Sequence, residues 1–187
     1  NAKVALTFVP PQFASEAIIE AADANCELLV CIPEGIPAKD EAKTYDILMK
    51  EYNSKLLGPN CPGLISPGKS NVGIMPPEIT KEGNVGVVSR SGTLTYQAVY
   101  ELTELGIGQS TCIGIGGDPV PGLSFVDILD MFEKDNNTDS VVMIREIGLI
   151  VTIGYLVTEA ETIWLLDNKG GATNGHTGAY DQETGFG

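Results

Sequence analysis

The sequence predicts an α/β protein that is built on mostly parallel sheets and divided into two parts. Three observations support this fold class. Short apolar runs alternate with segments of helical period over residues 1–150, a pattern typical of βαβ units. The chain has 187 residues, 43% of them hydrophobic, which is enough for one large or two small packed cores. Residues 61–83 are rich in proline and glycine, which ends regular elements and predicts a boundary there.

The first part, residues 1–62, is expected to contain three strands separated by two helices. The strands are short apolar runs, and the helices carry apolar residues three or four positions apart. In chain order the expected elements are a strand at 3–9, a helix at about 11–24, a strand at 28–33, a helix at about 38–52 and a strand at 55–60. The second helix is expected to place four side chains on one face: Tyr45, Leu48, Met49 and Tyr52.

Residues 63–83 follow as a predicted linker or hairpin, and residues 84–187 form the second part. Its expected elements are a strand at 84–90, a helix within 91–106, a strand at 110–117, a helix at 124–134 and a strand at 140–148. The first helix is expected to end at Gly106 and to share one face among Leu94, Ala98, Leu102 and Leu105. Ser124 and Asp127 are expected to cap the second helix, which buries Phe125, Ile128, Leu129 and Phe132.

Charge and cysteine content exclude several classes of function. The net charge is −14 with only 11 Lys and Arg, and no basic cluster is present, so a nucleic-acid partner is not expected. Cys26, Cys31, Cys61 and Cys112 form no CxxC pair and no metal-ligand spacing, which predicts buried thiols of a reducing compartment. No metal site is predicted. The longest apolar run, residues 147–157, is too short to span a membrane, and no signal peptide opens the chain, so a secreted or membrane protein is not expected.

The segment SRSGT, residues 89–93, joins a predicted strand to a predicted helix through small residues. Its free backbone N–H groups and the positive end of the helix can face an anion, which makes it a candidate phosphate cradle. The alternative is an ordinary helix start that is capped by Ser91. The segments 113–122 and 168–176 match neither a dinucleotide fingerprint nor a P-loop. No site for a nucleoside triphosphate is therefore predicted on this chain.

Two further residues leave alternatives open. Cys61 lies in the loop GPNCPG and is either a nucleophile or a buried thiol, and the absence of a nearby histidine in the sequence favours the buried thiol. His176 is the only histidine and lies among glycines in GGATNGHTGAYD. From composition alone it reads as a solvated loop residue, whereas glycine neighbours also suit a reactive group on a moving loop.

Several motifs together resemble the α subunits of succinyl-CoA synthetases, the succinate–CoA ligases of the citric acid cycle. They occur in the family's order and spacing over about residues 1–148: EGIP, GPNCPG, SPGK with VGIMP, GVVSRSGTLTYQAV, GQSTCIGIGGDPVPG, DILDMFEKD and EIG. The block around SRSGTLTY with GIGGDP is closer to this family than to its acyl-CoA synthetase and ATP citrate lyase relatives. The resemblance implies a Rossmann-like CoA-binding domain, incomplete here, followed by a flavodoxin-like ligase domain.

The resemblance also implies roles for individual residues. GHTGA makes His176 the histidine that carries the phosphoryl group, and REIGL makes Glu146 the carboxylate that orients it. The phosphohistidine faces the turn made by Ser89, Arg90, Ser91, Gly92 and Thr93. Tyr96 is then near the substrate, CoA contacts Ile32, Pro33 and Glu34, and Asn60, Cys61 and Pro62 lie near the active site.

The implied activity is an acid–thiol ligase that forms succinyl-CoA reversibly from succinate, CoA and ATP or GTP. A β subunit is the implied partner, in an αβ or α2β2 complex, and it is expected to hold the nucleoside triphosphate and Mg²⁺. The implied compartment is the bacterial cytoplasm or the mitochondrial matrix. Two alternatives remain, namely a related nucleoside-diphosphate-forming ligase for another acid and a non-catalytic assembly subunit.

The chain departs from the family pattern at both ends. The glycine-rich loop that holds most CoA contacts in the family is absent before Asn1, so a fragment is expected, with CoA binding weaker than in a complete subunit by a factor of at least about a hundred. Arg145 and Leu149 replace the glycines that flank the glutamate in the family's motif, and residues 149–174 do not follow the family's course.

Overall fold

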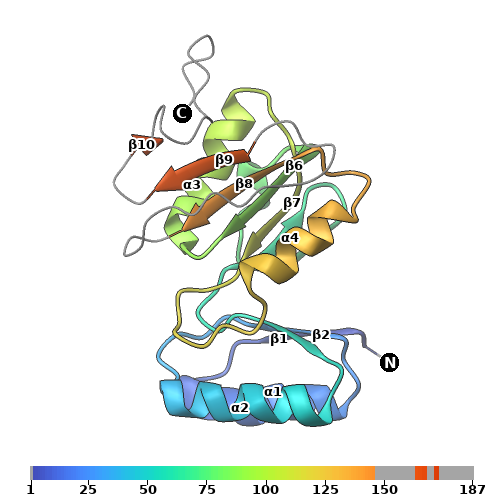
Figure 1. Ribbon diagram of the computed structural model, residues 1–187, viewed down its shortest axis with the longest axis vertical. Coiled ribbons are helices and arrows are strands. Elements are labelled where there is room, and N and C mark those ends of the chain that lie inside the picture. The colour runs from blue at the N-terminus through green and yellow to red at the C-terminus, as the bar shows by residue number, and fades with distance from the viewer. Residues whose placement is uncertain (1, 146–162, 168–170, 173–187) are drawn as a thin grey trace.

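The computed structural model describes residues 2–145, 163–167 and 171–172. Within these ranges two sheets lie one above the other, each with its own helices (Figure 1). The α/β class with mostly parallel sheets, predicted from the alternation of apolar runs and helical periods, is confirmed. Glu146 and His176, and the end of the strand expected at 140–148, lie outside the described residues.

The N-terminal sheet is parallel, with strand order β1-β2-β3, and both of its helices cover the same face (Figure 1). Its helices bury a core of small and apolar side chains that includes Ala14, Ile18, Leu29 and Leu48. The elements are β1 (Val4–Thr7), α1 (Pro11–Asp23), β2 (Leu28–Cys31), α2 (Ala38–Glu51) and β3 (Lys55–Leu57).

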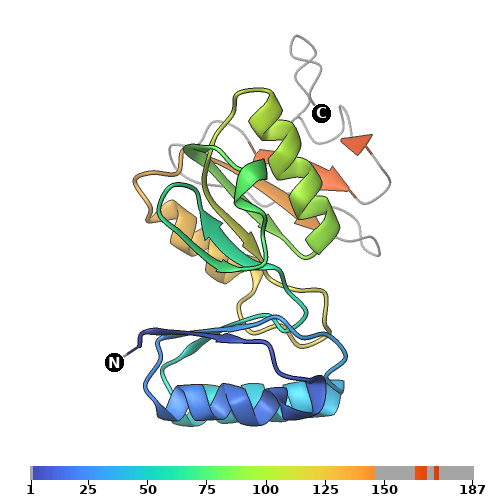
Figure 2. The same ribbon diagram turned by 180° about the vertical axis from the view of Figure 1, so that it is seen from behind.

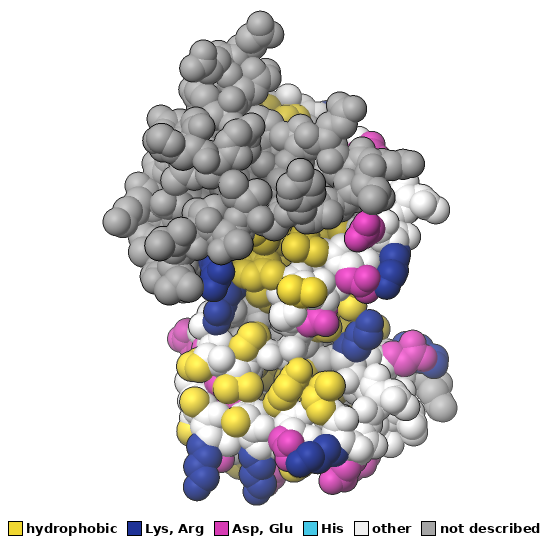
Figure 3. All heavy atoms as spheres, viewed as in Figure 1, with side chains coloured by type: hydrophobic (Ala, Val, Ile, Leu, Met, Phe, Trp, Pro, Cys, Tyr) yellow, Lys and Arg dark blue, Asp and Glu magenta, His cyan; other side chains and the backbone are white. Residues whose placement is uncertain are grey.

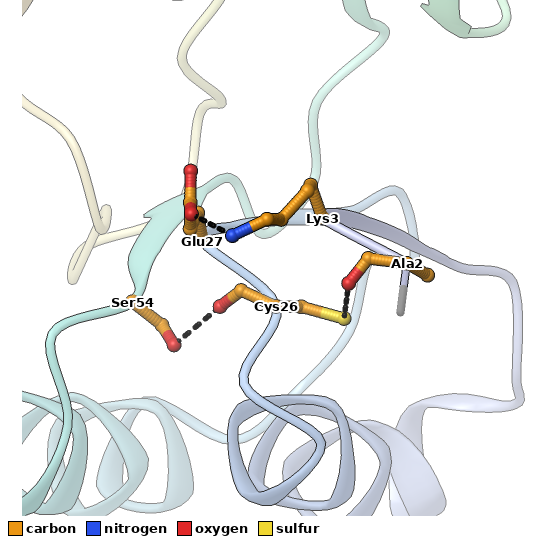
Figure 4. A network of polar contacts seen from close by, with 5 residues as sticks. All are labelled: Ala2, Lys3, Cys26, Glu27 and Ser54. Atoms are coloured by element: carbon orange, nitrogen blue, oxygen red, sulfur yellow. Dashed lines mark hydrogen bonds and ion pairs between the residues drawn. The ribbon is translucent and has the colours of Figure 1, made fainter.

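The amino ends of these three strands are tied together by polar contacts (Figure 4). The Ser54 hydroxyl donates to the Cys26 carbonyl oxygen at 2.6 Å, and the Cys26 thiol lies 3.7 Å from the Ala2 carbonyl oxygen. Lys3 and Glu27 form an exposed ion pair beside them. An exposed ion pair of this kind contributes little to stability, so the hydrogen bonds between the strands stabilise this edge. Ligands of parallel sheets bind at the opposite edge, where the strands have their carboxyl ends.

The second sheet has strand order β10-β9-β8-β6-β7-β4-β5. Strands β9, β8, β6 and β7 run parallel, whereas β4, β5 and β10 pair antiparallel. Figures 1 and 2 show α4 on one face of this sheet and α3 on the other, the arrangement of a doubly wound fold. The elements are β4 (Gly63–Ser66), β5 (Ser70–Gly73), the 3-10 turn η1 (Pro77–Ile79), β6 (Glu82–Ser89), α3 (Gly92–Glu104), β7 (Gln109–Gly114), α4 (Phe125–Glu133), β8 (Ser140–Arg145), β9 (Ile163–Asp167) and β10 (Gly171–Ala172).

Two cores fill the two faces of the second sheet. Val87 and Cys112 face α3, where Ala98, Val99 and Leu102 cover them. The other core packs under α4 and also reaches the N-terminal sheet, because it contains residues of both sheets: Val30, Leu57, Cys61, Val88, Ile113, Ile115, Ile128, Phe132 and Val141. This shared core joins the two parts of the chain.

Helix α4 begins as the sequence predicts. Ser124 is its N-cap and accepts a hydrogen bond from the Asp127 backbone N–H, while the Asp127 carboxylate accepts from the Ser124 backbone N–H at 2.8 Å. The Ser124 hydroxyl also donates to the Asp127 carboxylate, and this bond, followed by the one from the Ser124 backbone N–H, lowers the pKa of Asp127. The predicted capping box is therefore confirmed.

Two predicted buried side chains are wrong. Met49 is 65% exposed and Leu105 is 55% exposed. Helix α2 buries Glu41, Thr44 and Leu48, so of its predicted apolar face only Leu48 is fully buried, while Tyr45 and Tyr52 are half-buried. Leu105 is not in the helix interior but at its C-cap, and Gly106 follows at φ 81° to end the helix as expected.

Most of the predicted strands are shorter at their carboxyl ends in the structure. Strands β2, β3 and β7 end at Cys31, Leu57 and Gly114, a few residues before the sequence pattern predicts. The residues released from the strands form the loops between the two sheets. Residues 63–73, expected within a linker or hairpin, form the β4–β5 hairpin, and β4 pairs with β7 in the second sheet.

Among the residues that the structure describes, every helix is too short or too polar to cross a lipid bilayer. On the face seen in Figure 3, acidic and basic side chains are interspersed over the N-terminal part rather than gathered by sign.

Candidate functional site

A cavity of about 320 Å³ lies where the two sheets meet. Its walls come from the carboxyl ends of β2 and β6, the loops after β3 and β7, and the amino end of α3, where open α/β sheets bind their ligands. We call it the junction cavity. It is lined by Ile32, Glu34, Asn60, Cys61, Pro62, Ile74, Arg90, Gly92, Tyr96 and Gly117.

The junction cavity brings together residues that the sequence names from three separate motifs. All of its lining residues except Ile74 and Gly117 were predicted site residues. Pro33, Ser89, Ser91 and Thr93 lie beside the cavity but are not part of its wall. Whether these residues bind a ligand remains a prediction.

The turn from β6 to α3 uses most of its own polar groups. Ser89 is fully buried, and its hydroxyl accepts from the Ser91 backbone N–H at 3.0 Å. The Arg90 backbone N–H donates to the Ile144 carbonyl oxygen at 3.1 Å. Ser91 is the N-cap of α3 and accepts from the Leu94 N–H at 3.4 Å, so the capping role considered from the sequence is present.

Two backbone amides of this turn stay available. Gly92 and Thr93 occupy the first two helical positions, whose N–H groups have no acceptor within a helix, and the described residues supply none. An added Cβ at Gly92 would meet no atom within 4 Å, so the space in front of it is open. These two amides and the positive end of a 13-residue helix form a surface that suits an anion.

Arg90 links the two loops at the cavity. Its Nε donates to the Gly116 carbonyl oxygen at 3.1 Å, and its Nη2 donates to the Gly117 and Asp118 carbonyl oxygens at 3.0 and 2.7 Å. Gly116 has φ 95°, and a Cβ there would collide with the Pro59 carbonyl oxygen. The paired glycines of GIGGDP thus let this loop pass close to GPNCPG and receive the arginine.

The loop GPNCPG is fixed from both sides. Asn60 has φ 52°, its N–H donates to the Pro33 carbonyl oxygen at 2.9 Å, and its carbonyl oxygen accepts from the Gly117 N–H at 3.3 Å. The Asn60 side-chain Nδ2 donates to the Asp118 carboxylate at 2.8 Å. Asn60 therefore connects the end of the N-terminal sheet to the loop after β7.

Cys61 does not have the character of a nucleophile. Only 4% of it is exposed, its thiol lies 3.3 Å from the Cys31 carbonyl oxygen, and burial raises its pKa to about 12. All four cysteines are free and buried, which confirms the predicted buried thiols. Tyr96 also lines the junction cavity, and burial raises the pKa of its phenol, so the hydroxyl stays neutral and can donate a hydrogen bond.

Sequence reasoning missed two polar residues at this junction, Glu41 and Asp118. Asp118 follows the glycines of GIGGDP, a motif that the sequence marks as a loop at a strand end but does not connect to Asn60. Glu41 sits in the first turn of α2, where an acidic residue is ordinary on helix-dipole grounds. No spacing in the sequence places these two carboxyl groups together.

Family models match both parts of the chain. A model described as a CoA binding domain matches residues 1–35, and a model described as CoA-ligase matches residues 88–163.

Curated relatives match about four fifths of the chain. The chain is 58% identical over 149 residues to a protein named succinate–CoA ligase (ADP-forming) subunit alpha of Aquifex aeolicus, which covers 79% of this chain and 49% of that protein. It is 57% identical over 148 residues to subunit alpha 2 of Archaeoglobus fulgidus, with 79% and 51% covered. It is 53% identical to the Staphylococcus aureus protein of that name, with 79% and 49% covered. The chain therefore spans about half the length of these relatives.

Solved structures share the fold at low sequence identity. One is the dinucleotide forming acetyl-coenzyme A synthetase 1 of Ca. Korarchaeum cryptofilum in complex with phosphate and ADP, with a TM-score of 0.72 at 23% identity over 88% of this chain and 37% of that chain. Another is ATP citrate lyase of Methanothrix soehngenii in complex with citrate and coenzyme A, with a TM-score of 0.74 at 22% identity over 99% of this chain and 33% of that chain.

Proposed function

We propose, on the basis of 53–58% identity to succinate–CoA ligase α subunits over 79% of the chain, that this protein works as such a subunit. The proposed activity is the reversible formation of succinyl-CoA from succinate, CoA and ATP or GTP. The observation that supports it most is the junction cavity, because three motifs shared with that family meet in its wall.

The proposed division of labour follows the two parts of the chain. Residues 1–62 contribute to a CoA-binding domain, and residues 84–187 form the ligase domain with its phosphohistidine loop. Ile32, Pro33 and Glu34 follow the carboxyl end of β2, the edge at which parallel sheets bind their ligands. The CoA binding domain model, which ends within this segment, supports their role toward CoA.

The phosphoryl group is proposed to sit before the amino end of α3. A phosphoryl group carries about two negative charges at neutral pH. The backbone amides of Gly92 and Thr93 can donate to it, and the Arg90 guanidinium lines the same cavity. Because Arg90 is held by three carbonyl groups, it lies in place before a ligand arrives.

His176 is proposed as the residue that carries the phosphoryl group, with Glu146 as its orienting carboxylate. The imidazole nitrogen attacks the γ-phosphorus, the nucleoside diphosphate leaves, and a phosphohistidine remains. A succinate carboxylate oxygen then attacks that phosphorus to give succinyl phosphate and frees the imidazole. The CoA thiolate finally attacks the acyl carbon and releases inorganic phosphate. The nucleoside triphosphate and Mg²⁺ are proposed to lie on a β subunit, which completes the enzyme.

A labelling experiment tests this proposal. The chain is mixed with the β subunit of its own complex and radiolabelled ATP or GTP, and the label on the chain is followed. Because His176 is the only histidine, an acid-labile and alkali-stable label that is lost in His176→Asn is assigned to it. We expect such a label in the wild type, its loss in His176→Asn, and its discharge by succinate.

The outcomes separate the alternatives. Discharge by another carboxylic acid but not by succinate would indicate a related ligase with a different substrate. A folded complex without any label would indicate a non-catalytic assembly subunit. An alkali-labile label that persists in His176→Asn would place the phosphoryl group on another type of residue.

A further inference from the structure

The carboxyl groups of Glu41 and Asp118 lie within hydrogen-bonding reach of each other. Glu41 lies in the first turn of α2 and is 5% exposed, and Asp118 lies in the loop that follows β7. Both carboxyl oxygens of Glu41 and Oδ2 of Asp118 are buried and make no well-formed hydrogen bond in the described ranges, and only the Val120 backbone amide approaches Glu41 closely enough to lower its pKa. Buried carboxyl oxygens without donors are costly, so a partner for them is required.

One shared proton supplies that partner. Two ionised carboxylates are only acceptors and repel each other, whereas a protonated carboxyl donates to its neighbour. Burial, and then the neighbouring Asp118 carboxyl, raise the pKa of Glu41 to about 7, against a smaller lowering by the Val120 backbone amide. The proton is therefore assigned to Glu41 and the negative charge to Asp118.

The other charged or titratable groups nearby do not stabilise a second negative charge on the pair. The Arg90 guanidinium donates to the carbonyl oxygens of Gly116, Gly117 and Asp118, not to a carboxylate. Cys31 and Cys61 stay neutral thiols, because burial raises the pKa of each to about 12.

The pair also determines how Asn60 is turned. Oδ1 of Asp118 accepts from Asn60 Nδ2 at 2.8 Å, and an ionised carboxylate at this place excludes the flipped amide, whose oxygen would face it. The amide oxygen of Asn60 then has no donor in the described part of the chain, and Asn60 lines the junction cavity.

We propose that Glu41 and Asp118 share one proton and act as positioning residues, which hold the Asn60 amide so that its oxygen accepts from a ligand in the junction cavity. The group that this oxygen recognises is a donor, such as a hydroxyl, an amide N–H or a thiol. The pair joins α2 of the first sheet to the β7 loop of the second, so it also ties the two parts of the chain. This inference does not depend on the proposed enzymatic activity.

Nuclear magnetic resonance of the whole chain tests the proposal without any ligand. The side-chain amide signals of Asn60 are identified by their loss in Asn60→Ser and followed with pH, and the carboxyl carbon of Glu41 is followed in the wild type. We expect both to titrate together with a midpoint near neutral pH. In Glu41→Gln, whose amide donates without titrating, the step at Asn60 should disappear while the signals stay in place.

Asp40→Asn is the matched control, since it removes one exposed carboxylate from the same turn of α2. It should keep the Asn60 step. A carboxyl carbon chemical shift that shows Glu41 already ionised at pH 5 would overturn the shared proton, and this measurement needs only the wild-type protein. A step that persists in Glu41→Gln, or one that Mg²⁺ or Ca²⁺ abolishes by occupying the three oxygens, overturns it as well.

Discussion

At the scale of single residues, the proposed anion site uses the backbone amides of Gly92 and Thr93. Gly92 is the first residue of α3, where proline is tolerated because its missing N–H has no helical acceptor. Ser91 before it has φ −96° and ψ 122°, which is compatible with a following proline. Gly92→Pro thus removes one proposed donor while the helix can still form.

We expect Gly92→Pro to weaken the binding of inorganic phosphate or sulfate by on the order of 10- to 100-fold, the value of one hydrogen bond to a charged group. Gly92→Ala is the control, because its Cβ meets nothing within 4 Å and its N–H is kept. Calorimetric titration of the three proteins measures the effect. Equal affinities for phosphate in all three would mean that the anion does not bind at this amide.

Glu41 makes a prediction for stability as a function of pH. Its folded pKa is raised from 4.5 to about 7, so its favourable contribution is complete below about pH 4.5 and is lost as the pH rises through 7. The free energy of unfolding should fall by up to about 3 kcal/mol across this window. Glu41→Gln should remove this dependence and be the more stable protein at pH 8.

Chemical denaturation at pH 5 and pH 8 measures this effect. Asp40→Asn, which removes an exposed carboxylate from the same turn, should keep the wild-type dependence. A Glu41→Gln variant that parallels the wild type at both pH values would show that Glu41 is ionised throughout.

At the scale of elements, β6 and α4 pack closely because residue 86 of β6 is a glycine, which leaves room for the Phe132 ring of α4. A Cβ added at Gly86 would lie 2.8 Å from the Phe132 ring, whose side chain is 3% exposed. Gly86→Ala should therefore destabilise the fold by about 1–3 kcal/mol through overpacking. Phe132→Leu alone should cost about as much, because it removes buried ring atoms.

The double variant Gly86→Ala/Phe132→Leu separates overpacking from other effects. It should be more stable than the sum of the two single changes predicts, since the smaller side chain makes room for the methyl group. Denaturant unfolding of the four proteins gives this coupling energy. Additive effects would mean that the Phe132 ring does not limit the size of the side chain at residue 86.

The helices and strands were largely predictable from the sequence, because the spacing of apolar residues and the helix caps depend only on residues that are close together in the chain. Ser124 and Asp127 are three residues apart, and the capping box they form could be read directly. Strand ends were predicted too late, since apolar residues such as Ile32 continue the pattern after the strand has stopped.

Most residues that line the junction cavity were predicted from the resemblance to a family and not from local sequence patterns. The contact between Asn60 and Asp118 spans 58 residues, and no local signal encodes it. The pairing of Glu41 with Asp118 depends in addition on how the two sheets stack. Such contacts follow from tertiary packing, which neither secondary-structure propensities nor the spacing of apolar residues describes.

At the scale of the whole molecule, the two sheets should unfold together. Leu57 ends β3 of the first sheet, is 1% exposed, and belongs to the core that also contains Val88 and Ile128 of the second part. Ile18 is equally buried but packs only within the first part. These two residues therefore distinguish a shared core from a local one.

Leu57→Ala should cost about 2–5 kcal/mol and speed amide hydrogen exchange in both β2 and β6, because the cavity that it leaves weakens both sheets. Ile18→Ala should cost a similar amount but speed exchange chiefly in the first sheet and its helices. Hydrogen exchange followed by mass spectrometry compares the two. If Leu57→Ala leaves β6 as protected as in the wild type, the two parts unfold independently.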